Sequence, residues 1–284
     1  MLSFSEVVPT RSLVLTGVGI VAAVVLMMGG CSSGDEGSPP GAEELFKSAK
    51  EKFDEEDYLE AYEQFRVLTL QYQGSAFADD AQFYLGECQF RREDYILASF
   101  EYETLIRIMP TSEFVSNAQY QLAMCYYNRS PEYYHDQEFT VKAIDAFQAF
   151  LEYYPTDPRV PDAELRINEL NAKLARKEYE SGVIYMRMEY YRAATVSFDH
   201  VLEKYHDSPF AEPALLRKAE SLYARRRFRD ARDIATRFLE KYPSSSLRQT
   251  AESLLNDAKE AVEEQAKSAK QTTDNSGAGI PQPL

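Results

Sequence analysis

Few side chains in this sequence could support metal binding or nucleophilic catalysis. Two of its three cysteines, Cys88 and Cys125, lie well inside the chain, and its three histidines are His135, His200 and His206. None of the histidines shares a metal-ligand spacing with a cysteine or carboxylate pair. The sequence also contains no glycine-rich phosphate loop, nucleophile elbow or dinucleotide-binding fingerprint. We therefore expect no enzyme activity, no metal site and no cofactor.

The third cysteine, Cys31, predicts a covalent lipid attachment. It ends the segment MGGC (28–31), which completes an uncharged apolar stretch that fits a signal-peptide core or a marginal membrane helix. The segment resembles the lipobox of bacterial lipoproteins, whose cysteine thiol receives a diacylglycerol and becomes the mature N-terminus. The resemblance implies a signal peptide over residues 1–30 and lipidation of Cys31. An uncleaved membrane anchor is the alternative.

The residues after Cys31 and the net charge indicate where the mature chain would act. Ser32 rather than an aspartate follows the cysteine, which in the lipoprotein pattern implies sorting to the outer membrane, on its periplasmic face. Residues 31–41 are small, polar and acidic, and they predict a flexible tether. The net charge of −15 opposes binding to nucleic acid and to anionic lipid. We expect the lipid anchor to be the only membrane contact.

The rest of the chain contains an internal repeat that predicts pairs of helices. Each of five segments contains an alanine twelve residues before a helix breaker or near-breaker. In four of these segments, a small residue stands twelve residues before that alanine. The alanines are Ala61, Ala98, Ala143, Ala194 and Ala231, and the small residues are Ala49, Gly86, Gly182 and Ala219, with Ala123 in the third unit. A small residue lets two helices approach closely, and an aromatic residue four positions after most of the alanines fills the space above it. Helix pairs of this kind resemble tetratricopeptide repeats.

The repeat predicts an all-α solenoid of five tetratricopeptide-like helix pairs with a C-terminal capping helix. Repeats one to three occupy residues 42–157, and repeats four and five with the cap occupy residues 158–268. Two of the units are longer than the others. The extra residues of the third unit predict a loop at 128–139, and those of the fourth predict one long helix from about Pro161 to Met188.

The segment after the fifth unit predicts the capping helix. Residues 247–268 place Leu254, Leu255, Ala258 and Val262 on one side of a helix. A solenoid needs such a cap because its last unit would otherwise expose an apolar face. The remaining residues, 269–284, predict a disordered tail.

Aromatic residues on the first helix of each unit predict a binding groove. In the first three units they stand seven residues apart, about two turns, on the face turned away from the paired helix. Packing between units is one interpretation. The other is a groove for an extended peptide with apolar or aromatic side chains, whose carboxylate a nearby Lys or Arg would hold. The predicted groove consists of Phe46, Lys50, Phe53, Phe83, Phe90, Arg91, Tyr120 and Tyr127.

A run of arginines interrupts the acidic background at the turn of the fifth unit. A solvated charged face is one interpretation, and a docking patch for an acidic partner is the other. The run consists of Arg225, Arg226, Arg227, Arg229 and Arg232.

Together these features resemble one family. A lipobox, a short tether and five repeats with an enlarged loop and a long central helix are similar to the BamD (ComL/YfiO) family, the tetratricopeptide lipoproteins of the outer-membrane β-barrel assembly machinery. In the stretch from AFQAFLEYYPTDPRV through LNAKLARKEYE to EKYHDSPFAEPAL, the turns and the long helix follow the family's order. His206 and Gln73-Gly74 stand where the family usually has turn prolines, and the acidic balance is unusually strong.

The resemblance implies a non-catalytic adaptor. Its N-terminal repeats would receive the C-terminal targeting strands of unfolded outer-membrane proteins, which end in an aromatic residue and a carboxylate. Its C-terminal repeats would dock on the periplasmic repeat domains of the barrel-forming insertase.

Two other classes of protein share parts of this pattern. A tetratricopeptide lipoprotein of another envelope system, either a peptidoglycan-linked coordinator or a pilus pilotin, would share the anchor and the repeats. The coordinator should also carry a coiled-coil trimer segment, and the pilotin tends to lack the long spacer helix. An enzyme with a helical superstructure would need a separate catalytic domain, for which the repeats leave no length.

Overall fold

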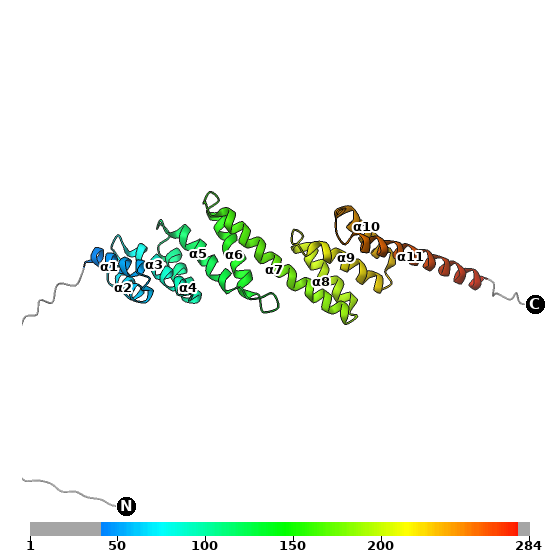
Figure 1. The fold of residues 1–284 in the computed structure, drawn as a ribbon, viewed down its shortest axis with the longest axis horizontal. Coiled ribbons are helices and arrows are strands. Elements are labelled where there is room, and N and C mark those ends of the chain that lie inside the picture. Colours follow the sequence, from blue (N-terminus) through cyan, green and yellow to red (C-terminus); the bar gives the residue numbers. More distant parts are fainter. Residues whose placement is uncertain (1–40, 278–284) are drawn as a thin grey trace, which may run out of the picture. The chain divides into compact units, whose positions relative to one another are not determined.

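The computed structural model describes residues 41–277, with side chains to residue 269, and this part of the chain consists of helices joined by short turns (Figure 1). The predicted signal peptide, residues 1–30, and the tether up to residue 40 lie outside the described residues. No strand occurs in residues 41–277, which confirms the all-α class. The helices are α1 (Ala42–Asp54), α2 (Tyr58–Gln71), α3 (Ala78–Arg91), α4 (Tyr95–Ile108), α5 (Val115–Arg129), α6 (Glu138–Tyr153), α7 (Val160–Arg187), α8 (Tyr191–Lys204), α9 (Ala211–Ala224), α10 (Phe228–Lys241) and α11 (Arg248–Gly277).

Successive helices pack against each other along the chain. Each helix from α1 to α10 contacts the next one, and further contacts join α3 to α5, α7 to α9 and α9 to α11. The helices therefore form five pairs, α1/α2 to α9/α10, in which first helices of neighbouring pairs also meet. Helix α11 packs on the last pair in the place of a sixth first helix (Figure 1). This arrangement confirms the predicted five helix pairs and the capping helix.

The small residues of the repeat lie where the two helices of a pair touch. A Cβ atom added at Gly86 would lie 2.5 Å from Cε1 of Tyr102, and one added at Gly182 would lie 2.5 Å from Cε1 of Phe198. Both rings are fully buried, as are the five repeat alanines. The glycines are required because the aromatic ring of the second helix occupies the space of their side chain.

Four of the helix pairs share one tight turn. In the second pair, Glu93 has a left-handed backbone with φ of 61°, and the N–H of Asp94 donates to the carbonyl of Gln89 at 2.9 Å, which closes α3 as a Schellman motif does. Asp94 then caps α4, because its Oδ1 accepts from the N–H of Leu97 at 3.3 Å. Glu56, Glu189 and Arg226 adopt the same left-handed conformation in the first, fourth and fifth pairs.

The two insertions contact each other. Helix α7 contains Pro161 in its first turn and matches the predicted long helix to within one residue at each end. The loop between α5 and α6 is held against it: Lys173 Nζ donates to Ser130 Oγ at 2.8 Å, and the Arg176 guanidinium lies 4.1 Å from the ring of Tyr133. The added length of the third repeat therefore packs on the added length of the fourth.

The boundary predicted for the disordered tail, residue 269, is wrong. Helix α11 continues to Gly277, and residues 278–284 lie outside the described part of the chain. The segment from Glu263 to Lys270 consists of Glu, Gln, Ala, Lys and Ser, most of which are strong helix formers. Since extension of an existing helix is far easier than nucleation, α11 propagates past its last packed residue.

Cys88 and Cys125 are free thiols buried in the packed core, as predicted. Burial away from water raises the pKa of the Cys88 thiol to about 12, with a smaller contribution from Glu87, and burial also raises the pKa of Cys125. Both side chains are thus protonated and unreactive near neutral pH.

Candidate functional site

Four of the predicted groove residues lie together around one cavity, which we call the central pocket. It has a volume of about 380 Å³ and takes residues from the first helices of three repeats and from the turn before α7. The lining residues are Phe53, Phe83, Tyr84, Glu87, Arg91, Asn117, Tyr120, Gln121 and Arg159. The chain therefore brings together residues that are more than one hundred positions apart in the sequence.

Two more predicted residues, Phe46 and Lys50, line a neighbouring cavity of about 400 Å³, which we call the first-repeat pocket. Its other lining residues are Glu43, Lys47, Glu51, Asp54 and Phe77. The Lys50 ammonium lies 5.4 Å from the ring centres of both Phe53 and Tyr84, which belong to the central pocket. The two pockets thus meet at these side chains.

The last two predicted residues, Phe90 and Tyr127, line neither pocket. Phe90 packs against Tyr95 with ring centres 5.3 Å apart. The Tyr127 hydroxyl donates to Glu169 at 2.6 Å, and its ring lies 4.8 Å from the Arg166 guanidinium, so it joins α5 to α7. Phe90 thus packs on the second helix of its own pair, whereas Tyr127 packs between the third and fourth repeats.

The aromatic residues that do line the pockets also pack between repeats. Phe46 stacks on Phe77 with ring centres 5.2 Å apart, and Phe83 stacks on Phe114 at 4.9 Å. Tyr84, which the sequence analysis did not single out, contacts both Phe46 and Phe53. Each ring is only partly buried, so one side packs in the core and the other faces a cavity.

The floor of the central pocket is a buried carboxylate. Glu87 is 7% exposed, and its Oε1 accepts from the Tyr102 hydroxyl and from Gln121 Nε2, both at 2.7 Å. Arg91 Nε lies 3.8 Å from the other oxygen. Burial, reinforced by the neighbouring Glu87 charge, raises the pKa of Tyr102, so its hydroxyl remains a donor. These bonds hold the Glu87 carboxylate in place without an additional ligand.

Arg159 is the cation that sequence reasoning missed. Its side chain forms a fork with Asp157, with Nε to Oδ1 at 2.8 Å and Nη2 to Oδ2 at 2.6 Å, and its guanidinium lies 5.1 Å from the ring of Tyr120. The hydrogen bond from Arg159 lowers the pKa of Asp157. No local sequence signal marks this residue, because it lies in the turn before α7, outside the repeated helices. It reaches the central pocket only because this turn packs against Tyr120 and Phe150 of the third repeat.

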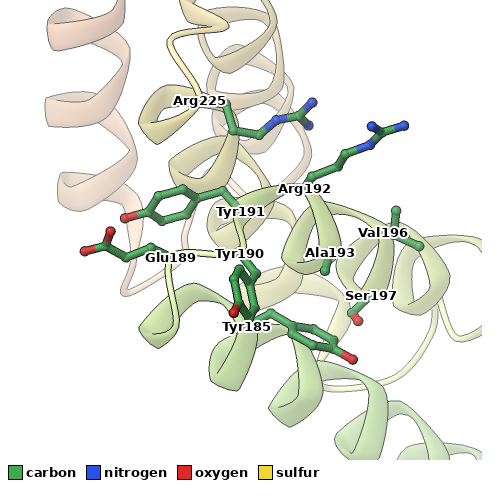
Figure 2. Close-up of a pocket in the computed structure, with 9 residues that line it drawn as sticks. All are labelled: Tyr185, Glu189, Tyr190, Tyr191, Arg192, Ala193, Val196, Ser197 and Arg225. Atoms are coloured by element: carbon green, nitrogen blue, oxygen red, sulfur yellow. The ribbon is translucent and has the colours of Figure 1, made fainter.

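A third cavity lies in the C-terminal half, and we call it the C-terminal pocket (Figure 2). It has a volume of about 750 Å³ and is formed by the end of α7, the start of α8 and the turn after α9. Its lining residues are Tyr185, Glu189, Tyr190, Tyr191, Arg192, Ala193, Val196, Ser197 and Arg225. Tyr190 and Val196 are 58% and 64% exposed, so the wall presents apolar surface to solvent.

Only one residue of the predicted arginine patch, Arg225, lines this pocket. Figure 2 shows its guanidinium on the same side of the pocket as that of Arg192. Arg227 pairs with Asp230 and Arg232 pairs with Asp233, both on α10 or directly before it, so these two charges are already compensated. Arg226 and Arg229 are exposed and form no ion pair within the described residues.

Residues 41–277 contain no group of three or more His, Cys, Asp or Glu side chains that could hold a metal ion. Within the same range, every helix is too short or too polar to cross a bilayer. Cys31 lies outside the described residues.

The chain matches the models of one protein family and of one repeat. The model of the YfiO family, described as outer membrane lipoprotein, matches residues 40–227, which include the lining residues of all three pockets. The chain belongs to this family. A tetratricopeptide-repeat model matches residues 213–245, which cover most of α9 and all of α10.

Individual relatives are more distant. The outer membrane protein assembly factor BamD of Rickettsia prowazekii (strain Madrid E) is 31% identical over 87 residues, which are 31% of this chain and 35% of that protein. The match therefore spans about a third of the length of the curated relative. Among solved structures, the chain is similar to the TPR2AB domain of yeast Sti1 in complex with pHSP90. The match covers 80% of this chain and 86% of that one, with 15% sequence identity and a TM-score of 0.41. The chain is also similar to a tetratricopeptide repeat protein from Parabacteroides merdae. This match covers 85% of this chain and 81% of that one, with 16% sequence identity and a TM-score of 0.34.

Proposed function

We propose that this protein is a lipid-anchored adaptor on the periplasmic face of the outer membrane, where it helps to assemble and insert β-barrel proteins. The observation that carries the proposal is membership of the outer membrane lipoprotein family over residues 40–227. A relative named outer membrane protein assembly factor supports the same role. The segment 28–31, with Cys31 as the acylated residue, supplies the anchor and lies just before the family match.

The N-terminal half receives unfolded outer-membrane proteins in this proposal. An extended peptide alternates its side chains on two faces, so apolar side chains on one face would fill the first-repeat and central pockets. The pockets supply the matching chemistry: partly buried Phe and Tyr rings on the walls and Arg91 and Arg159 at the rim. Phe46, Lys50, Phe53, Phe83, Arg91 and Tyr120 remain assigned to peptide binding, whereas Phe90 and Tyr127 act as packing residues.

The C-terminal half docks on the barrel-forming insertase in this proposal. Interfaces use exposed aromatic and arginine side chains as anchors, and the C-terminal pocket combines three tyrosines with Arg192 and Arg225. Arg226 and Arg229 add uncompensated positive charge beside it, on a chain whose net charge is −15. An acidic surface on the periplasmic repeat domains of the insertase would therefore be attracted to this part of the molecule.

The experiment that tests the proposal is affinity purification of the tagged, full-length chain from detergent-solubilised outer membranes, followed by mass spectrometry. We expect stoichiometric recovery of a large β-barrel protein with periplasmic repeat domains. Recovery of peptidoglycan-binding proteins or of a secretin in its place would contradict the proposal, while the helical-repeat structure would stand. A Cys31→Ser variant serves as the control for the anchor and should leave the outer-membrane fraction.

A further inference from the structure

We infer that the outer side of the first two repeats lies against the lipid bilayer and inserts apolar side chains into its surface. These side chains belong to the second helices of the two pairs, and we call their surface the apolar face. It consists of Leu59 and Leu70 of α2 and of Ile96, Leu97, Phe100 and Ile108 of α4. This second membrane contact rests on the proposed lipid anchor at Cys31, and it goes beyond the sequence-based expectation that the anchor is the only one.

The six side chains form one surface because α2 and α4 lie next to each other (Figure 1). The Tyr62 hydroxyl of α2 donates to Oε1 of Glu101 of α4 at 3.0 Å, which joins the two helices. Leu97 and Ile108 stand on either side of Glu101 along α4, eleven residues or about three turns apart, so they share a stripe beside this bond. The two leucines of α2 have the same separation. All six residues are between 47% and 63% exposed.

The repeat itself does not require apolar side chains at these places. Each second helix from α2 to α10 contains a buried alanine, Ala98 in α4, from which equivalent positions can be counted. The residues at the position of Phe100 in the first, third and fifth pairs are all carboxylates: Glu63, Asp145 and Asp233. The fourth pair has Val196, which lines the C-terminal pocket. Since charged side chains are compatible with the fold here, the apolar residues of α4 have a role outside solenoid packing.

The composition of the apolar face favours lipid over a protein partner. Protein interfaces are enriched in Tyr, Trp, Met and Arg, whereas surfaces that enter the membrane interface present Phe, Leu and similar side chains. The apolar face contains only Leu, Ile and Phe, in contrast to the C-terminal pocket with its three tyrosines.

The charges around the apolar face also permit contact with a bilayer. The exposed charged residues of α2 and α4 are two arginines and three glutamates, a net charge of −1: Arg66, Arg107, Glu60, Glu63 and Glu103. Glu63 and Arg66 are 3.9 Å apart and partly compensate each other. A nearly neutral surface is only weakly repelled by anionic lipid, although the whole chain has a net charge of −15.

The length of the chain between the anchor and the first helix keeps this face near the membrane. Residues 31–41 separate Cys31 from α1, and eleven residues span at most about 40 Å when fully extended. They lead directly into the helix pair that contains α2, and α4 belongs to the next pair. Attachment at Cys31 therefore gives the apolar face a high effective concentration at the bilayer, so a weak contact is sufficient.

The test uses the absence of tryptophan from the sequence. Phe100→Trp makes the apolar face the only source of tryptophan fluorescence. Tyr134→Trp is the matched reporter outside the face, because Tyr134 is 65% exposed in the loop between α5 and α6. The lipidated full-length variants are reconstituted into vesicles of phosphatidylethanolamine and phosphatidylglycerol, with or without bromine on the acyl chains. We expect bromine to quench about half of the emission of Phe100→Trp, since interfacial side chains reach the acyl boundary, and to leave Tyr134→Trp unquenched.

A second substitution shows whether the quenching depends on the apolar face. Leu97→Glu places a charge in the face, so it should reduce the quenching of Phe100→Trp to the level of Tyr134→Trp while the protein still floats with the vesicles. Gln148→Glu adds the same charge to an exposed position of α6 and should leave the quenching unchanged. Circular dichroism of both variants checks that the helices are intact.

Four results would overturn the inference. If Phe100→Trp floats with the vesicles but is not quenched, or if both reporters are quenched equally, the face makes no specific lipid contact. A blue shift of Phe100→Trp that increases with protein concentration and needs no lipid would mean that a second copy covers the face. These results leave the proposed anchor and the assembly function intact. If the protein does not float with vesicles at all, the proposed anchor fails together with the inference.

Discussion

At the residue scale, Gly182 shows how one missing side chain sets the distance between two helices. A Cβ atom at this position would approach the ring of Phe198 to 2.5 Å. We expect Gly182→Ala to lower the free energy of unfolding by about 1–3 kcal/mol, because a buried ring must shift in a packed core. Urea unfolding followed by circular dichroism measures this change.

The chain supplies a matched control for that substitution. A Cβ atom at Gly74 would meet no atom within 4 Å, so Gly74→Ala should change the free energy of unfolding by less than about 0.5 kcal/mol. A second substitution, Phe198→Leu, should recover part of the loss in Gly182→Ala because it makes room for the added methyl group. Equal destabilisation by both alanine variants would show that the contact between Gly182 and Phe198 does not limit the packing.

Two phenylalanines of α3 separate binding from packing. Phe83 and Phe90 both pack against the core cluster that contains Tyr102, but only Phe83 lines the central pocket. Phe83→Ala and Phe90→Ala should therefore destabilise the protein to a similar extent, whereas only Phe83→Ala should weaken binding of a synthetic strand peptide with alternating apolar residues, by about tenfold for the loss of a partly buried ring. Fluorescence anisotropy of this peptide below the unfolding temperature of both variants measures the affinities. Unchanged affinity in Phe83→Ala would remove the central pocket from the proposed groove.

At the scale of elements, α11 stabilises the last helix pair by covering its apolar face. Ala258 is fully buried and packs with Leu222 of α9 and Ala231 of α10. Ala258→Glu places a charge in this contact, so we expect α11 to detach and the amides of α10 and α11 to exchange faster with deuterium. Lys259→Glu changes the net charge more but alters an exposed position, and it should leave the exchange rates unchanged. Protection of α11 in Ala258→Glu would mean that the cap is held by other contacts.

How far the sequence predicts these elements depends on whether the signal is local. The bounds of α7 follow from the repeat period and from Pro161, both of which can be read along the chain, so the prediction is correct to within one residue. The end of α11 has no local stop signal, and helix propagation carries it to Gly277. In the candidate site, the roles of Phe90 and Tyr127 depend on which side chains pack against them from other helices, and Arg159 enters the groove from a different repeat. A periodic pattern identifies a face of a helix, but it does not specify which side chains or ligands pack against that face.

At the scale of the whole molecule, the two candidate sites lie on opposite sides of α7 along the chain. The first-repeat and central pockets use residues up to Arg159, just before α7 begins, whereas the C-terminal pocket uses residues from Tyr185 onward. Among the described residues, none lines both an N-terminal pocket and the C-terminal pocket. If each site serves one partner, substitutions at one site should leave the other partner bound.

A pair of variants tests this separation. Tyr190→Ala combined with Arg225→Glu removes an aromatic side chain and reverses a charge in the C-terminal pocket, so we expect it to abolish recovery of the insertase in the affinity purification and to leave peptide affinity unchanged. Phe83→Ala should show the reverse pattern. Charge reversal elsewhere in the fifth repeat is the control: Arg232→Glu, whose arginine is already paired with Asp233, should retain the insertase. Loss of both partners in either test variant would show that the two halves do not act independently, and loss of the insertase in Arg232→Glu would extend the docking surface to the whole arginine run.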